Sequence, residues 1–293
     1  DDELLEILEQ LRAADGVVVV ASAGNAGPNP YLTGSPGAGD GVISVAANDS
    51  TEKFPGATLT LDGQDIEGIE AINANGAELP AGPYDVVALT DDPATADENE
   101  KLGCSVAAFE KAREAAGVSA GDTTIAVTTR GVCARVARAA YGQMAGFDAV
   151  VMINTLDPAN PDALPPFEGP ITEIPETDPL VEIDVTIPFL GVHPSSGPGL
   201  IAASGSRLTI TPKDLVNQGF EGYGSFTSSG PRSGDSALKP SVTAPGVSIA
   251  SAAVGSGTGA MFLSGTSMAA PHVAGVAALG VEAHPDWTGQ DVS

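Results

Sequence analysis

The stretch from Phe262 to Leu279 reads FLSGTSMAAPHVAGVAAL, and it decides how the rest of the chain is interpreted. The run from Met268 to Leu279 is apolar and small on most faces, which predicts a buried helix. Ser267 stands at the first turn of that helix, where backbone N–H groups are unpaired and the helix dipole has its positive end. Gly265 allows a tight turn there, and Pro271 is tolerated near a helix start. Such a serine is either a helix cap or a nucleophile beside a site that stabilises negative charge.

His272 is the histidine nearest to Ser267 in the sequence, but helix geometry excludes it as the base for this serine. Five residues turn a helix through about 500° and raise it by about 7.5 Å, so the two side chains lie on different faces. Proton transfer needs hydrogen-bond contact, which this separation prevents. We therefore interpret His272 as a packing residue, and His193 and His284 as surface loop residues.

The segments at the two ends of the chain predict an α/β fold. Leucines at helical spacing predict an amphipathic helix at the very start of the chain. GVVVVASAGNAGP (16–28) and VISVAA (42–47) are apolar runs typical of strands that are buried on both faces of a parallel sheet. Ligand sites in such sheets lie beyond the carboxyl ends of the strands, where Ser22 to Gly27 stands.

The middle of the chain has a different texture. Apolar and polar residues alternate over 58–68, which predicts half-buried antiparallel strands with Asp62-Gly63 as a hairpin turn. Residues 132–146 have helical periodicity. Four more short segments predict strands: 84–89, 124–130, 149–154 and 186–192. We predict a separate α+β domain over 57–211, inserted into a host domain formed by 1–56 and 212–293.

Composition excludes several classes of function. The chain has 38 acidic residues and 12 Lys plus Arg, a net charge of −26, whereas nucleic-acid binding needs a basic surface. The acidity most simply serves solubility. No run approaches the roughly 18 apolar residues that a membrane span needs. Cys104 and Cys133 are an even pair, which fits either one disulfide outside the cytosol or two buried thiols.

Four blocks of the chain resemble successive blocks of the subtilisin-like serine proteases, in the same order: GVVVVASAGNAG, FTSSGPR, KPSVTAPGV and LSGTSMAAPHVAG. Within the middle segment, TTRGVCARVARAAYGQMAGFDAVVMIN and IPFLGVHPSSGPGLIAA resemble the protease-associated domain that many secreted subtilases carry as an insertion. The resemblance covers essentially the whole chain. It implies a partial subtilisin-like catalytic domain with a parallel sheet, interrupted by a protease-associated domain at 57–211. Residues 1–56 would hold the oxyanion block, and 212–293 the nucleophile block.

The resemblance also implies roles for single residues. Ser267 would be the nucleophile, and Asn25 would donate to the oxyanion beside the Ser267 N–H. From its loop alone, Asn25 is equally a residue that tolerates a left-handed turn. The segment Ala21, Ser22, Ala23 and Gly24 resembles the strand that walls the pocket for the substrate side chain. Protein or peptide substrates are implied, and the acyl transfer needs no cofactor.

Two blocks of the resembled family do not occur in this sequence. In the family, the catalytic Asp and a Gly-His-Gly block come earlier in the chain, and Asp40 and Asp235 stand in the wrong blocks to replace the aspartate. We therefore expect a truncated serine endopeptidase that is inactive by itself, because removing the base leaves only oxyanion and binding effects. The alternative is a non-catalytic subtilase-like scaffold whose protease-associated domain binds protein partners.

The cysteines and acidic clusters complete the expectations. Protease-associated domains often carry a cysteine after the Arg-Gly of this block, so the resemblance favours a Cys104–Cys133 disulfide and an extracellular location. Calcium, which many subtilases bind, has no support in the spacing of Asp91-Asp92 and Asp97-Glu98, which we interpret as a solvated loop. We predict no metal site, and we interpret GSPGAGDG (34–41) as a turn. The oligomeric state is left open.

Overall fold

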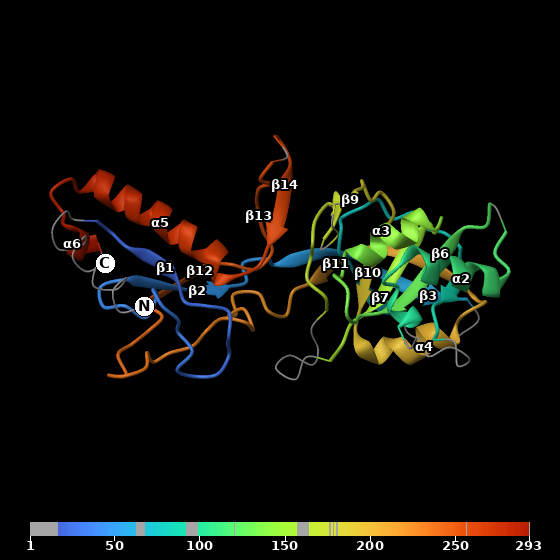
Figure 1. The fold of residues 1–293 in the computed structure, drawn as a ribbon, viewed down its shortest axis with the longest axis horizontal. Coiled ribbons are helices and arrows are strands. Elements are labelled where there is room, and N and C mark those ends of the chain that lie inside the picture. The colour runs from blue at the N-terminus through green and yellow to red at the C-terminus, as the bar shows by residue number, and fades with distance from the viewer. Residues whose placement is uncertain are drawn as a thin grey trace. The chain divides into compact units, whose positions relative to one another are not determined.

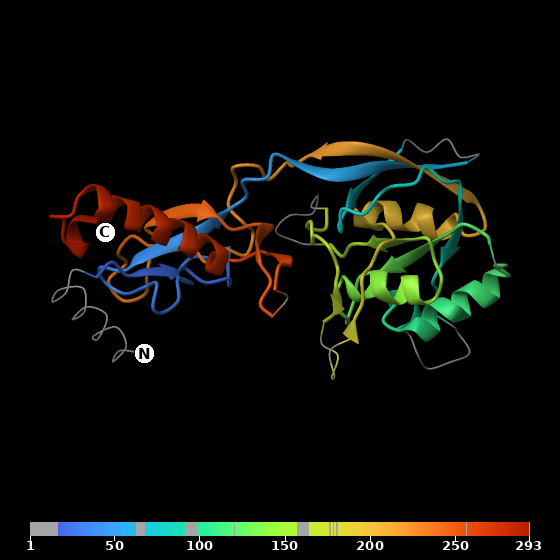
Figure 2. The ribbon, with the colours of Figure 1, turned by 90° about the horizontal axis from the view of Figure 1, so that it is seen from above.

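The computed structural model describes residues 17–62, 68–91, 99–119, 121–156, 164–175, 177, 179, 181–255 and 257–292. The chain forms two compact units (Figures 1 and 2). The sheet unit comprises Asp1–Glu52 and Asn217–Ser293, and the barrel unit comprises Lys53–Val216. These boundaries lie a few residues outside the predicted 57–211. The predicted first helix and the Gly63 turn position lie outside the described residues.

The sheet unit is built on three parallel strands and one helix. β1 (Val20–Ser22), β2 (Ile43–Asn48) and β12 (Val242–Pro245) lie in the order β1-β2-β12, and α5 (Thr266–Ala283) packs against all of them (Figure 1). This mixed α/β arrangement with parallel strands agrees with the predicted fold class. The core residues of this unit are Ile43, Val45, Ala47, Ala244 and Ala269. A hairpin of β13 (Ile249–Ala252) and β14 (Ala260–Leu263) leads into α5, and α6 (Gly289–Val292) follows it.

The prediction that the helix after Ser267 is buried was wrong for most of its length. Thr266, Ala269 and Ala277 are its buried residues, whereas Val276 is 68% and Leu279 is 64% exposed. The physical reason is that one three-stranded sheet covers only one side of α5. The apolar residues on its other side lie open to solvent.

The barrel unit contains a closed barrel, in which the strands are neighbours in the order β10-β4-β3-β11-β5-β6-β7. The strands predicted at 84–89, 124–130, 149–154 and 186–192 are present as β5, β6, β7 and β10. The strand bounds are β3 (Lys53–Leu61), β4 (Ile69–Asn73), β5 (Tyr84–Ala88), β6 (Thr124–Thr129), β7 (Ala149–Ile153), β10 (Phe189–Val192) and β11 (Arg207–Val216). The other elements are α2 (Val106–Ala116), α3 (Ala137–Met144), α4 (Gly197–Ala202), β8 (Glu173–Ile174), β9 (Val181–Glu182) and short 3₁₀ turns at Glu100–Leu102 and Pro194–Ser196.

Both faces of the barrel strands are covered by apolar side chains. Val86 and Leu200 belong to one buried cluster, and the adjacent Val87 belongs to a second cluster with Phe109 of α2. This alternation follows from the two-residue period of a strand. The predicted helix over 132–146 is present only over Ala137–Met144, and the loop before it carries Cys133, which forms a disulfide with Cys104.

Candidate active site

Three hydrogen bonds join the loop after β1 to the start of α5. The Thr266 N–H and the Thr266 hydroxyl both donate to Oδ1 of Asn25, at 3.0 and 2.9 Å. The Gly24 N–H donates to Oγ1 of Thr266 at 3.1 Å. Gly265, the residue before the helix, has no side chain, so Asn25 caps α5 in its place. Because a backbone N–H can only donate, these bonds fix which end of the Asn25 amide faces the helix.

The free end of the Asn25 amide borders the backbone of Ser267. A Cβ placed on Gly265 would lie 3.3 Å from Asn25 Nδ2 and 3.7 Å from the Ser267 nitrogen. Both nitrogens therefore lie close to one point beside the buried Gly265, while Asn25 and Ser267 themselves are exposed. Within the described residues, neither the Ser267 N–H nor Asn25 Nδ2 donates to a protein acceptor. Hydrogen-bond donors beside an exposed serine hydroxyl are the groups that stabilise a developing oxyanion.

Ser228 holds the Asn25 loop from the other side. It is fully buried, its N–H donates to the Gly24 carbonyl at 2.9 Å, and its Oγ accepts from the Ala26 N–H at 3.1 Å. Gly24 has φ +106°, and a Cβ there would lie 2.9 Å from Ser228 Oγ, so glycine is required at this position. The loop is thus anchored on both flanks of Asn25.

Sequence reasoning missed Thr266 and Ser228 as positioning residues. Both stand inside the blocks that carried the family resemblance, which was the only available signal. Ser228 lies 202 residues from Ala26 in the sequence, and no local pattern reveals such a partnership.

The predicted substrate-binding segment lies at the same sheet edge. Ala21 and Ala23 are buried, and Ser22 is partly buried. Gly24 is linked to the start of α5 by the hydrogen bond from its N–H to Thr266 Oγ1. The Ala23 carbonyl accepts from Gly34 N–H at 2.9 Å, which ties the segment to the 34–41 loop. Their role in substrate binding stays a prediction.

The histidines do not approach Ser267. His272 is exposed, not packed as we predicted, and its Nδ1 lies 2.8 Å from the Met268 carbonyl of its own helix. His284 stacks on Trp287 with ring centroids 3.8 Å apart. His193 belongs to the barrel unit, where its Nδ1 accepts from the Ser195 N–H at 3.1 Å. Across the described residues, which include all three histidines, none is hydrogen-bonded to Ser267.

Metal ligands do not gather in the part of the chain that the structure describes, where no group of three or more His, Cys, Asp or Glu side chains comes together. Asp91 instead pairs with Lys101 at 2.6 Å, and this hydrogen-bonded ammonium lowers the pKa of the Asp91 carboxyl. Asp92, Asp97 and Glu98 lie outside the described residues. Among the described helices, none has the length and apolar character that crossing a membrane requires.

Comparison with known proteins decides the family. The chain matches the sequence model of the subtilase family over residues 2–293. The chain belongs to the subtilase family. This subtilase chain is 30% identical over 290 residues to subtilisin-like protease SBT3.8 of Arabidopsis thaliana, covering 93% of this chain and 33% of that protein. It is 27% identical over 295 residues to the minor extracellular protease Vpr of Bacillus subtilis (strain 168), covering 95% of this chain and 31% of that protein. The subtilase chain thus spans about one third of the length of these curated relatives.

Solved structures resemble this subtilase only distantly. The psychrophilic subtilisin-like protease Apa1 from the Antarctic psychrotroph Pseudoalteromonas sp. AS-11 is 17% identical with a TM-score of 0.31, over 100% of this chain and 59% of that chain. BSAP, a zinc aminopeptidase from Bacillus subtilis, is 18% identical with a TM-score of 0.35, over 58% of this chain and 33% of that chain. The assignment to the subtilases therefore rests on the sequence matches.

Proposed function

We propose that this chain provides the nucleophile and the oxyanion hole of a subtilisin-like serine endopeptidase. Ser267 Oγ attacks the carbonyl carbon of the peptide bond, and the resulting oxyanion accepts hydrogen bonds from the Ser267 N–H and from Asn25 Nδ2. The observation that carries the proposal is the pair of unused donors beside the exposed serine at the start of α5. The segment from Ala21 to Gly24 borders the side chain of the substrate.

The hydrogen bonds around Asn25 support this proposal, because they hold its side chain in place before a substrate binds. Thr266 holds Oδ1 of Asn25, and Ser228 holds the loop, so little reorganisation is needed as negative charge develops. In subtilisin itself, a member of this family, loss of the side-chain donor raises the barrier by about 3 kcal/mol. That value comes from the relative, and we apply it to Asn25 only as an expectation.

We further propose that the base and the aspartate come from polypeptide outside these 293 residues. All three histidines are engaged elsewhere, as described above. The apolar residues Val276, Leu279 and Val281 of α5 are exposed and offer a surface for such a segment to cover. By itself the chain is then expected to hydrolyse no peptide at a useful rate, because none of its three histidines is placed to accept the Ser267 proton.

The barrel unit is, in this proposal, a protease-associated domain in a secreted protein. The resembling blocks correspond to β6, α3 and β7 and to β10 and α4 of the barrel unit. The Cys104–Cys133 disulfide fits an oxidising compartment outside the cytosol. Protein or peptide substrates follow from the chemistry proposed for Ser267.

The test is covalent labelling of the natural protein, purified from its source, with a fluorophosphonate probe, followed by mass spectrometry. We expect the probe on Ser267, no labelling after Ser267→Ala, and no labelling of the 293-residue chain alone. Asn25→Ala should lower kcat by about 10²–10³-fold with little change in KM, because the donor acts mainly in the transition state. Asn29→Ala, at an exposed asparagine of the same loop, serves as the matched control. Natural protein that remains unlabelled would contradict the proposal and would favour a non-catalytic scaffold.

A further inference from the structure

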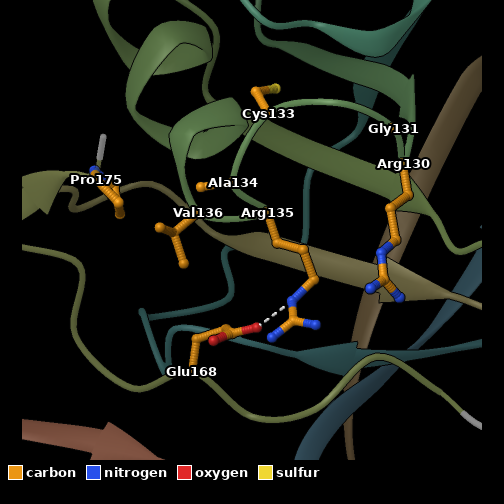
Figure 3. A pocket seen from close by; sticks show the side chains of 8 residues that line it. All are labelled: Arg130, Gly131, Cys133, Ala134, Arg135, Val136, Glu168 and Pro175. Carbon is orange, nitrogen blue, oxygen red and sulfur yellow. Dashed lines mark hydrogen bonds and ion pairs between the residues drawn. The ribbon is translucent and has the colours of Figure 1, made fainter. Parts of the chain in front are cut away.

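The barrel unit contains a pocket that is rich in arginine, although the chain as a whole is strongly acidic. The pocket has a volume of about 350 Å³ and is lined by residues of the 130–136 loop together with Glu168 and Pro175 (Figure 3). Arg130 and Arg135 stand in this loop, and Arg138 stands in α3 directly after it, in a chain with a net charge of −26. Residues 130–138 are therefore a basic stretch within an acidic chain.

The two arginines that line the pocket have different neighbours. Figure 3 shows Arg130 and Arg135 extending to the same side of their loop. Arg130 donates from Nη1 to Oδ1 of Asn154 at 2.9 Å. Arg135 pairs with Glu168 through Nε. Within the described residues, Nη1 and Nη2 of Arg135 make no hydrogen bond, so one edge of its guanidinium is available.

Arg138 adds a third positive charge beneath the loop. It is fully buried, and its Nη1 donates to the carbonyls of Cys133 and Ala134 at 3.2 and 3.1 Å. Its Nε is buried and has no partner among the described residues. Burial, and then repulsion from Arg130 and Arg135, lowers the pKa of Arg138 to about 10. Among the described residues, Glu168 is the only carboxylate that lines the pocket.

We propose that this pocket binds a carboxylate group of a peptide. A guanidinium presents parallel N–H groups that match the two oxygens of a carboxylate, and Oε1 of Glu168 already accepts from Nε of Arg135. A second carboxylate would bind the Nη groups of Arg135, and the positive charge of Arg130 on the same side of the loop would attract it. A singly charged group suits the site better than a phosphate dianion, because Glu168 repels additional negative charge. The volume is enough for one or two residues around the bound group.

The loop that forms the pocket is held in place before any ligand binds. The Cys104–Cys133 disulfide ties it to the turn before α2, and Arg138 bonds its carbonyls from below. A site with fixed donors loses less conformational freedom on binding. Carboxylate binding in this pocket does not depend on the chemistry proposed for Ser267.

The experiment is a titration of the 293-residue chain carrying Ser267→Ala, followed by NMR of ¹⁵N-labelled arginine side chains. Four probes distinguish the sources of the charge: acetyl-Gly-Ala-Ala with a free carboxylate, the same peptide amidated, amidated acetyl-Gly-Asp-Ala, and inorganic phosphate. We expect saturable shifts with the free acid, with the aspartyl peptide or with both, and none with the amidated Gly-Ala-Ala. If the free acid binds and the aspartyl peptide does not, the ligand group is a peptide C-terminus. If only the aspartyl peptide binds, it is an acidic side chain.

Matched variants locate the site. Arg135→Gln should weaken carboxylate binding about tenfold or more, because charged hydrogen bonds are lost. Arg130→Gln should weaken it less, because only a nearby positive charge is lost. Arg207→Gln is the control, since Arg207 is exposed on the same unit and pairs with Asp85. Glu168→Gln should strengthen binding several-fold by removing a competing carboxylate, a gain that misfolding cannot produce. The proposal is overturned by equal binding of the amidated Gly-Ala-Ala, by phosphate binding alone, by an equal loss in Arg207→Gln, or by no gain in Glu168→Gln.

Discussion

In the barrel unit, strands carry buried side chains on both faces, whereas in the sheet unit the largest apolar helix is covered on one side only. Val86 and Val87 are adjacent in β5, and both are almost fully buried, in different clusters. In α5, by contrast, Val276 and Leu279 face solvent. The difference lies in closure, because a closed barrel with flanking helices buries both strand faces and a three-stranded sheet buries one side of a helix.

The two units therefore differ in the contacts that stabilise them. The barrel unit has two apolar clusters and a disulfide within one continuous segment, so we expect it to unfold as an independent unit. The sheet unit carries the candidate active site on a smaller core. The only tryptophan, Trp287, belongs to the sheet unit, so its fluorescence reports on that unit, while circular dichroism reports on both.

The largest expected effect is in the barrel core. Phe109 is fully buried and meets Phe147 edge to face, with ring centroids 5.7 Å apart. Phe109→Ala should lower the free energy of unfolding of the barrel unit by about 3–5 kcal/mol, because it removes apolar contacts and leaves a cavity. Urea denaturation followed by circular dichroism measures the change. An equal shift in the Trp287 transition would contradict independent unfolding of the two units.

The disulfide should have the next largest effect. Cys104 and Cys133 are 29 residues apart, and closing such a loop stabilises a fold by about 3–4 kcal/mol in the chain-entropy model. The double variant Cys104→Ala, Cys133→Ala should lower the barrel transition by this amount and leave the Trp287 transition in place. A reducing agent applied to the unmodified chain provides the control and should reproduce the shift. A barrel transition unchanged by both treatments would show that the loop is restrained equally well without the bond.

The third prediction concerns the sheet unit. Thr266 is buried, and its hydroxyl links the Gly24 N–H to Asn25 Oδ1. Thr266→Val keeps the shape of the side chain but leaves the Gly24 N–H without its acceptor, which should lower the free energy of unfolding by about 1–3 kcal/mol. Trp287 fluorescence during denaturation measures it. Thr60→Val, at an exposed position of β3 in the barrel unit, should leave this transition unchanged.

A smaller, pH-dependent effect is expected at Tyr84 of the barrel core. Burial, and then the charge of Asp148, raises the pKa of Tyr84 above its usual value, and its hydroxyl donates to the Pro80 carbonyl at 3.0 Å. A raised pKa in the folded state means stability that is complete below about pH 10 and is lost as the pH rises through the folded pKa. Tyr84→Phe should lower the free energy of unfolding by about 1 kcal/mol at pH 8, through the lost hydrogen bond.

At high pH the unmodified protein should lose the advantage in stability that it has over Tyr84→Phe at pH 8. Between pH 8 and pH 11 the unmodified barrel unit should lose more stability than Tyr84→Phe does, because the raised pKa keeps Tyr84 protonated in the folded state while the unfolded chain ionises. Circular dichroism during denaturation at both pH values tests this. Parallel losses in the two proteins would mean that Tyr84 ionises equally in the folded and unfolded states.

Sequence reasoning anticipated local elements better than their surroundings. Alternating and apolar runs located β5, β6, β7 and β10, because the strand period is visible within a few residues. The family motif named Ser267 and Asn25 as candidates, and their roles stay predictions. It did not reveal Ser228, whose partner Ala26 is 202 residues away. The exposure of α5 also escaped prediction, since an apolar helix pattern says nothing about how many neighbours cover it. Closure of the barrel depends on pairing between β7 and β10, which no local pattern shows.

The smallest effect on this chain is expected at Leu279, an exposed leucine of α5 that can be compared directly with a buried leucine of the barrel. Leu279→Ala removes a side chain that is 64% exposed, so the free energy of unfolding should change by no more than about 0.5 kcal/mol. Leu208→Ala, at a fully buried leucine of the barrel, should lose about 2–5 kcal/mol. If additional polypeptide covers α5 in the natural protein, as we propose, Leu279→Ala there should approach the loss at Leu208. A large loss at Leu279 in the 293-residue chain alone would mean that α5 is already covered in solution, for example by a second copy.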